Sequence, residues 1–247
     1  MAHGFQRMSR GRRRLVIAGG WSMLLAAPAW HAMAQPVQGK AKSKIGVVGS
    51  GRLGSAVGSL LVKAGHPVMF ASRHPEELKA LTDSLGPLAQ AGTVAQAVAF
   101  ADVILLAVPY GAVPDVGQQN RWQGKIVLDA TNAVAARDGA IVDEVKANGI
   151  GATTAKYLAG ARIVRVFNFT GAAEFTRESH RKPPLMAVPM AGNDAEALSV
   201  AARLVRDAGF DPVVVGGLSS ADRFAPGGKL FRQMGTAEEF RRAMDQP

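Results

Sequence analysis

The chain has 247 residues, 48% of them hydrophobic, and a formal net charge of +10 from 29 Lys and Arg against 19 Asp and Glu. This length supports one large or two small domains with a substantial hydrophobic core. Because the chain has no cysteine, disulfides, thiol catalysis and cysteine-ligated metals are excluded. Beyond the N-terminus no single basic block is present, and a phosphate-rich ligand explains the excess charge at least as well as nucleic acid. We expect no nucleic-acid partner.

The first 34 residues have the features of an export signal. They contain no acidic residue, and Arg12–Arg14 precede a modestly apolar stretch, Leu15–Trp30. Ala32–Ala34 (AMA) then provides a small-x-small cleavage site. The paired arginines predict a twin-arginine signal peptide at 1–34, followed by a polar linker at 35–43, and a periplasmic protein. The alternative is an uncleaved anchor, but the apolar stretch is shorter than the roughly 20 residues of a span, so we expect no stable membrane insertion after cleavage.

Lys44–Gly54, KIGVVGSGRLG, joins a short apolar strand to a G-x-G-x-x-G turn. In a dinucleotide-binding turn, Gly49 permits the tight bend, Gly51 lets the backbone approach a pyrophosphate, and Gly54 lets the next helix pack close to the strand. Apolar residues at helical spacing follow, so the helix N-terminus offers free N–H groups to the phosphates. The motif therefore predicts a dinucleotide site, with a purely structural turn as the alternative.

The end of the second expected strand, Val68–Ala71, distinguishes the two nicotinamide cofactors. An NAD site would place an Asp or Glu here to bind the ribose 2′-hydroxyl. This chain has Ser72 and Arg73 instead. A hydroxyl beside a guanidinium suits a 2′-phosphate, which predicts NADP. The alternative is that Arg73 is a solvated residue at the start of a helix.

Strand and helix patterns alternate along the rest of the chain, which predicts an α/β, doubly wound and mostly parallel sheet of the Rossmann type. Further strands are expected at Leu88–Ala91, Asp102–Pro109, Lys125–Asp129, Arg162–Phe167, Leu185–Met190 and Pro212–Val215. Helices are expected at Pro75–Leu85, Val94–Phe100 with Thr93 as the cap, Ala152–Leu158 and Ala195–Ala208. We expect an NADP-binding domain at 44–170 and a small C-terminal α/β portion at 171–247. Its charged tail, 241–247, is expected to fray.

Ligands of such sheets collect beyond the carboxyl ends of the strands. Pro109 and Tyr110 lie at the end of one expected strand and offer apolar surface to a ring. Asn132, Asn168 and Thr170 follow two others and could bind a carboxamide or a substrate oxygen. Asn and Thr are also frequent in loops for local reasons, so a structural role is the alternative for each.

Six stretches in the same order carry a family resemblance. They are IGVVGSGRLGSAVGSLLVKAGHPVMFASR, VILLAVPYGAV, VLDATNAV, VRVFNFTGA, PMAGNDAEA and LVRDAGFDPVVVGGLSSADRFAP, which span about Lys44 to Phe231. The chain resembles the NADP-dependent oxidoreductases related to the NADPH:deazaflavin (coenzyme factor 420) reductases. The resemblance implies a Rossmann domain, a small C-terminal portion that completes a cleft, and direct hydride transfer between the nicotinamide and a flat acceptor ring. No catalytic acid or base is then required.

The resemblance also implies cofactor contacts. Val108, Pro109 and Phe169 match the nicotinamide side, and Ser72 and Arg73 the 2′-phosphate positions. The phosphate-loop positions match Ser50, Gly51, Arg52 and Leu53. The acceptor stays open among flavin, deazaflavin and quinone-like rings, because the FNFTGAAEF stretch and the export signal depart from the deazaflavin reductases. The nucleotide module is similar to the cytoplasmic part of the six-transmembrane epithelial antigen metalloreductases as well.

Other functions stay open at this point. One is a non-catalytic NADP-binding sensor or partner module, in which Phe224 or Phe231 fills the acceptor slot. Another is a β-hydroxyacid-dehydrogenase-like reductase with Lys156 as its catalytic lysine, although strand signals after Gly149 argue against the long helical domain of that class. The histidines of the mature chain lack metal-binding spacing, so we expect no metal. A homodimer is an open alternative to a monomer.

Overall fold

β1 (Ile45–Val48) lies inside an eight-stranded sheet of order β3-β2-β1-β4-β5-β6-β7-β8. The computed structural model describes residues 42–245, and these residues belong to one compact unit. The predicted signal peptide and nearly all of the predicted linker lie outside the described residues. The other strands are β2 (Val68–Ala71), β3 (Ala89–Gly92), β4 (Val103–Leu106), β5 (Ile126–Asp129), β6 (Arg162–Arg165), β7 (Ala187–Gly192) and β8 (Asp211–Gly216).

The strand pairing confirms the predicted α/β fold. The strands from β3 to β6 pair in parallel, in the order 3-2-1-4-5-6 of a doubly wound nucleotide-binding sheet. β1, β4 and β5 are buried along their whole length, as their continuous apolar sequences predict. β7 then pairs antiparallel with β6, and β8 pairs parallel with β7. The C-terminal portion therefore extends the same sheet.

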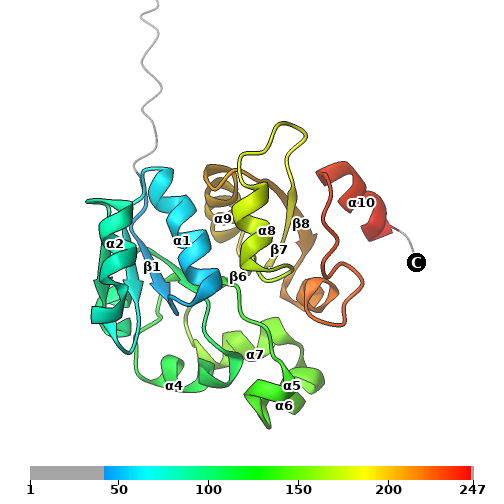
Figure 1. The fold of residues 1–247 in the computed structure, drawn as a ribbon. Helices are drawn as coiled ribbons and strands as arrows, with labels where there is room; N and C mark the ends of the chain where they lie inside the picture. The colour runs from blue at the N-terminus through cyan, green and yellow to red at the C-terminus, as the bar shows by residue number, and fades with distance from the viewer. Residues whose placement is uncertain (1–41, 246–247) are drawn as a thin grey trace, which may run out of the picture. The chain divides into compact units, whose positions relative to one another are not determined.

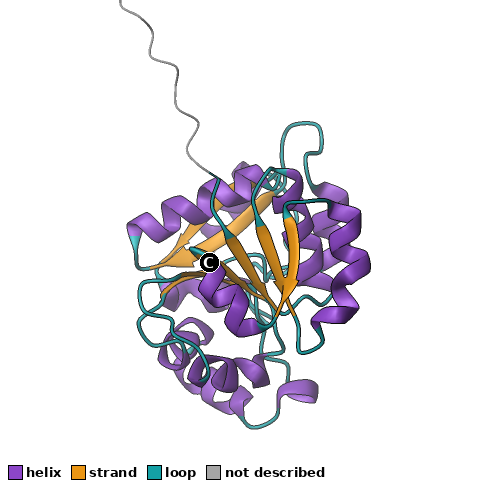
Figure 2. Cartoon of the chain, turned by 90° about the vertical axis from the view of Figure 1, so that its left-hand side faces the viewer, coloured by secondary structure: helices purple, strands orange, loops and turns teal. Residues whose placement is uncertain are grey.

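Helices cover both sides of this sheet (Figures 1 and 2). The α-helices are α1 (Arg52–Lys63), α2 (Lys79–Leu85), α3 (Val94–Phe100), α4 (Val113–Gln118), α5 (Ala135–Asp138), α6 (Ile141–Asn148), α7 (Ile150–Tyr157), α8 (Ala172–Glu178), α9 (Ala195–Asp207) and α10 (Ala237–Asp245). Short 3-10 helices are η1 (Pro75–Leu78), η2 (Tyr110–Ala112) and η3 (Leu218–Phe224). α1 packs between α2 and α8 (Figure 1), whereas α3 packs against β1 and β2, and α7 against β6. Within residues 42–245, no helix is both long and apolar enough to span a bilayer.

The expectation that residues 241–247 fray is wrong for 241–245, which belong to α10. Thr236 and Glu239 form a reciprocal cap at its start, since each backbone N–H donates to the other side chain, at 2.8 and 3.2 Å. Ala237 and Phe240 are buried, and the helix packs against β7 and β8. The charged sequence therefore forms the outer face of an amphipathic helix.

The first described residues are bound at the amino edge of the sheet. His66, buried in the turn between α1 and β2, lies with Nδ1 3.2 Å from the carbonyl oxygen of Ser43 and Nε2 2.9 Å from Oδ2 of Asp207. Arg203 donates to the Ser43 hydroxyl at 3.2 Å, and Lys42 lies 3.6 Å from the Asp207 carboxylate. Both acidic and basic groups of α9 thus contact the start of the described chain.

Candidate functional site

The glycine turn after β1 has the geometry of a phosphate loop. Gly49 has φ of 99°, and a Cβ there would lie 2.7 Å from the carbonyl of Ala107. A Cβ on Gly54 would overlap the Gly49 carbonyl oxygen, so this position sets the close approach of α1 to the turn. At Gly51, by contrast, no atom lies within 4 Å of the added Cβ. The space beside Gly51 is therefore open to a ligand rather than needed for internal packing.

Hydrogen bonds hold this turn against the end of β2. The Ser50 hydroxyl donates to the carbonyl of Ala71 at 3.1 Å, and the Ser50 N–H donates to the same oxygen at 3.2 Å. The Ser55 hydroxyl donates in turn to the Ser50 carbonyl at 2.9 Å. Since these bonds fix the turn, the free N–H groups at the start of α1 have a set direction.

A cavity of about 650 Å³ opens at this edge of the sheet. Its volume lies within the range of about 300–1,000 Å³ that is typical of small-molecule sites. It brings together residues from the glycine turn, the end of β2 and the loop after β4. The predicted site residues that line it are Gly49, Ser50, Gly51, Ser72, Arg73, Val108 and Pro109. The chain segments that contribute them are therefore adjacent in space, as the strand order requires.

The end of β2 supplies a cation to this cavity. Arg73 is exposed and forms no ion pair with any residue in 42–245, so its guanidinium is available to an anionic ligand. The Ser72 oxygen accepts a hydrogen bond from the His74 N–H at 3.1 Å, and the Ser72 N–H donates to Gly92 at 3.2 Å. These bonds fix the backbone that presents Arg73. The arrangement suits a phosphate monoester.

Apolar side chains form another wall of this cavity. Leu78 comes from η1, Val94 from the start of α3, and Val116 from α4. A cavity with this wall, a phosphate-binding turn and a free guanidinium fits the adenosine half of a dinucleotide. The structure therefore has residues that would hold such a cofactor.

Five predicted cofactor-binding residues lie outside the lining of this cavity. Arg52, Leu53 and Gly54 form the first turn of α1, where Leu53 packs against the hydrophobic core. Asn132 follows β5, and Phe169 follows β6. Their contacts with a cofactor stay predictions.

Phe169 lies inside an aromatic cluster rather than at a surface. Its side chain is fully buried. The rings of Phe175 and Phe240 pack edge-on against it, with ring centroids 5.8 and 6.4 Å from its own. Phe167, which lies two residues beyond β6 and has φ of 62°, packs edge-on against Phe175 with ring centroids 5.5 Å apart. The cluster fixes the course of the chain beyond β6. Phe169 can therefore support the loop beyond β6 without facing a ligand.

Tyr110 is also turned inward. It is fully buried, and its hydroxyl lies 3.3 Å from the Ile150 carbonyl and 3.1 Å from the Thr154 hydroxyl. Burial raises the pKa of Tyr110 above its ordinary value. Tyr110 thus packs the β4 loop onto α7, and Pro109 beside it is the residue that faces the cavity.

A buried polar network lies at the carboxyl ends of β5 and β6. Arg165 and Asp129 are both fully buried, with Nη1 of Arg165 2.7 Å from Oδ2 of Asp129. Nη2 of Arg165 also donates to the Thr131 carbonyl at 2.7 Å. Arg165 was not predicted from the sequence as a site residue. The available signal was the Asp at the end of the apolar strand IVLD and the two Arg in RIVRVF.

Asn132 and Asn168 are brought together by this network and bind each other. Nδ2 of Asn132 donates to the Asn168 carbonyl at 2.7 Å, and Nδ2 of Asn168 donates to Oδ1 of Asn132 at 3.2 Å. Asn168 also donates to the carbonyl of Phe224 at 3.2 Å, which ties η3 to the strand ends. Oδ1 of Asn168 and Nε of Arg165 are buried without a hydrogen-bond partner among the described residues. The two amides mainly join the loops of this wall.

Asp138 connects the β4 and β5 loops. It accepts hydrogen bonds from the N–H groups of Gly111 at 3.1 Å and Val134 at 2.7 Å, and Arg137 donates to it at 2.8 Å. Burial raises the pKa of Asp138, but these hydrogen bonds outweigh burial and hold that pKa below its usual value. Asp138 is thus an ionised clamp between two loops at the ligand edge.

Lys156, the lysine of the dehydrogenase alternative, lies apart from the cavity. Its ammonium group is 2.7 Å from the Glu144 carboxylate and largely exposed. Tyr157 donates to the same carboxylate at 2.6 Å. The sheet also continues through β7 and β8, where that class needs a long helical domain. Among the described residues, no group of three His, Cys, Asp or Glu side chains is placed to hold a metal ion.

Comparison with known proteins agrees with this geometry. Residues 44–133 match the family model described as NADP oxidoreductase, coenzyme F420-dependent. Metalloreductase STEAP3 of Rattus norvegicus is 28% identical over 192 residues, which cover 74% of this chain and 36% of that protein. The chain thus spans about a third of the length of this curated relative.

Solved structures share the fold. A hypothetical protein, SMa0349 from Sinorhizobium meliloti, is 27% identical with a TM-score of 0.70, over 79% of this chain and 96% of that one. A putative F420-dependent NADP reductase from Arthrobacter sp. FB24 is 22% identical with a TM-score of 0.61, over 72% and 87% of the two chains. The matched domain and these similarities agree with the NADP-dependent oxidoreductases expected from the sequence, and they leave the acceptor open.

Proposed function

We propose that this protein is an NADP(H)-dependent oxidoreductase that transfers hydride directly between the nicotinamide and a flat acceptor of the flavin, deazaflavin or quinone type. The observation that carries the proposal is the cavity itself, in which the open space at Gly51 and the exposed guanidinium of Arg73 lie together. Bound NADPH would supply the hydride. The chain's own residues then have to bind and orient the cofactor, and no proton has to be held by a catalytic side chain.

Different residues of the site would bind different parts of the cofactor. The glycine turn and the start of α1 would bind the pyrophosphate, and Ser72 and Arg73 the 2′-phosphate. Val108 and Pro109 at the end of β4 would bound the nicotinamide half. The contacts of Arg165 with Asp129 and Thr131 fix the β5 loop, so that this half of the site is formed before the ligand arrives.

A binding titration followed by rapid kinetics tests the proposal. The full chain is titrated with NADPH and NADH, and the NADPH complex is then mixed with flavin, deazaflavin and quinone acceptors in a stopped-flow instrument. We expect tighter binding of NADPH and rapid oxidation by one acceptor class. Tight binding without oxidation by any acceptor would instead support a non-catalytic NADP-binding module. A folded protein that binds neither nucleotide would rule out both functions.

We also propose that the protein is exported to the periplasm by the twin-arginine route. The support is the run Arg12–Arg14, the apolar stretch after it and the AMA site at Ala32–Ala34. Since this route carries folded proteins, the cofactor could cross with the chain. Fractionation of cells that express the wild type and a variant with Lys at all three arginine positions tests the proposal. We expect the processed wild type in the periplasm and the variant in the cytoplasm, and an equal distribution would refute this route.

A further inference from the structure

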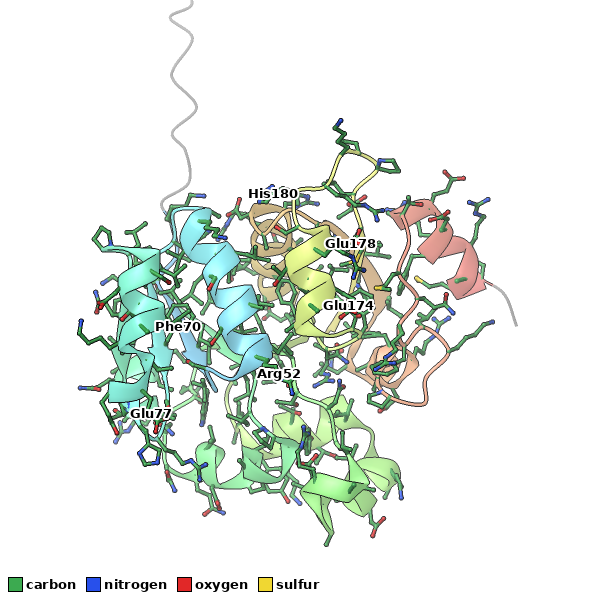
Figure 3. The ribbon with its side chains drawn as sticks, viewed as in Figure 1. Arg52, Phe70, Glu77, Glu174, Glu178 and His180 are labelled. Carbon is green, nitrogen blue, oxygen red and sulfur yellow. The ribbon has the colours of Figure 1, made fainter. Side chains whose placement is uncertain are left out.

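Two acidic side chains line the same cavity as Arg73: Asp115 from α4, and Glu77, which is the closer of the two to Arg73 along the chain. Glu77 belongs to η1, the 3-10 turn that follows β2, and this turn brings it back to the cavity four residues after Arg73. In Figure 3, Glu77 lies at the start of the η1–α2 segment and Arg52 at the start of α1, both toward the lower end of this helical layer. Neither Arg73 nor Glu77 has an ion-pair partner within residues 42–245. Both charges are therefore available to a ligand.

A carboxylate and a guanidinium that line one nucleotide cavity favour different nucleotides. The 2′-phosphate of NADPH has a charge of about −1.5 to −2 at neutral pH, so Arg73 attracts it and Glu77 repels it. The 2′-hydroxyl of NADH is a hydrogen-bond donor, and a carboxylate is the group that NAD sites use to accept from it. The position that normally carries that acid is occupied by Ser72 and Arg73, but Glu77 places a carboxylate in the same cavity by another path.

We propose that Glu77 is a specificity-determining residue that reduces the preference of this site for NADPH over NADH. The inference rests on the proposed NADP(H)-binding function and refines it: the protein uses NADPH preferentially but accepts NADH as a second hydride donor. Glu77 limits the affinity for the 2′-phosphate and supplies an acceptor for the 2′-hydroxyl. Arg73 supplies the remaining preference for NADPH.

The substitution Glu77→Gln tests this role because it keeps the shape of the side chain and removes its charge. Removal of one like charge from a partly solvated site changes affinity by about 3- to 10-fold. We expect the dissociation constant of NADPH to fall by about that factor and that of NADH to stay or rise. Nicotinamide fluorescence on the full chain gives both constants without any acceptor. Higher salt should reduce the difference between Glu77→Gln and the wild type, since it screens the repulsion.

Glu76→Gln is the matched control. Glu76 is the preceding residue of η1, is exposed at 73% of its side chain and lies outside the cavity lining, where it pairs with His74 at 3.4 Å. This substitution makes the same change in net charge, and we expect the ratio of the two dissociation constants to stay as in the wild type. Equal shifts in the two variants would show a general charge effect and overturn the assignment to Glu77.

A second pair of ligands locates the effect at the ribose. Calorimetric titration with 2′,5′-ADP and 5′-ADP should show the same shift in their affinity ratio on Glu77→Gln, because the two differ only in the 2′-phosphate. An unchanged ratio, with NADPH still bound tightly, would overturn the role of Glu77 and leave the proposed function intact. A folded wild type that binds none of the four nucleotides would overturn both.

Discussion

The guanidinium of Arg73 at the end of β2 is the free cation of the cavity wall within the described chain. A phosphate would form charge-assisted hydrogen bonds with it, which are worth about 1.5–3 kcal/mol. We predict that Arg73→Ala raises the dissociation constant of NADPH by about 10- to 100-fold and changes that of NADH little. Fluorescence titration measures both. Arg52→Ala, at the start of α1, is the contrasting variant: it should weaken both nucleotides alike, and an equal loss in Arg73→Ala would contradict the role of Arg73.

The buried pair of Arg165 and Asp129 predicts an asymmetric response to substitution. Arg165→Met leaves the Asp129 carboxylate buried without its partner, and loss of one member of such a pair costs about 3–5 kcal/mol. We predict that the double variant Asp129→Leu/Arg165→Met is more stable than Arg165→Met alone. Urea unfolding of the two proteins measures the free energies. If the double variant is the less stable, the ion pair does not account for the loss.

The α3 helix tests a local signal in the sequence. The Thr93 hydroxyl accepts from the Gln96 N–H at 3.3 Å, while the Thr93 N–H donates to Oε1 of Gln96 at 2.8 Å. We predict that Thr93→Ala destabilises the protein by about 1 kcal/mol, as measured by urea unfolding. Thr176→Ala in α8, where the hydroxyl only bonds to the carbonyl four residues back, should change stability much less. Equal losses would mean that the cap contributes nothing beyond the general effect of replacing an exposed Thr with Ala.

The elements that the sequence predicted well are those with strong local signals. β2 and α3 begin and end at the predicted residues, because a short apolar run and the Thr93 cap define their ends. α4, α6 and α8 were not predicted. Each has at most eight residues and no side-chain cap, and α4 contains Pro114 and Gly117. Packing on the sheet stabilises such helices more than their own sequence does.

The same distinction applies to the site. The glycine turn, Ser72, Arg73 and the strand-end loops follow from local motifs, and their segments meet as expected. The mutual hydrogen bonds of Asn132 and Asn168, and the inward turn of Tyr110 toward α7, join residues 36 to 44 positions apart. Glu77 was overlooked because it lies on a 3-10 turn past the strand end. Contacts of this kind depend on register and three-dimensional packing, so periodicity along one segment does not predict them.

The stability of the whole sheet depends on the contact between its parallel strands and the β7–β8 pair. Asp194, just after β7, lies at the antiparallel junction of β6 and β7. It caps α9 through the Ala197 N–H at 2.8 Å and pairs with Arg162 of β6. Hydrogen bonds from Arg162 and then from the Ala197 N–H lower the pKa of Asp194 from 3.8 to about 2. Because the folded value lies below the unfolded one, this stabilisation is complete above about pH 4 and is lost as the pH falls through about 2.

We therefore predict that Asp194→Asn destabilises the protein at pH 7 and that the difference from the wild type shrinks as the pH falls toward 2. Thermal unfolding at pH 7, 4, 3 and 2 measures this trend. Asp143→Asn in α6 is the control, since Asp143 is exposed at 82% of its side chain and pairs only with the neighbouring Lys146 in the described chain. A difference that is independent of pH would show that the Asp194 charge is not the stabilising group.

The contacts of Lys42 and Ser43 hold the chain in place mechanically just before it enters β1. Tension applied through the N-terminal segment, whether from a membrane, a surface or a fused domain, would reach His66, Arg203 and Asp207 before it reached β1. The load would thus fall on the α1–β2 turn and on α9 rather than on the strand that leads into the glycine turn. A chain that starts at Ile45 would lack these contacts, and His66 would lose the carbonyl of Ser43 as its partner. Truncations intended to preserve the cofactor site should therefore begin before Lys42.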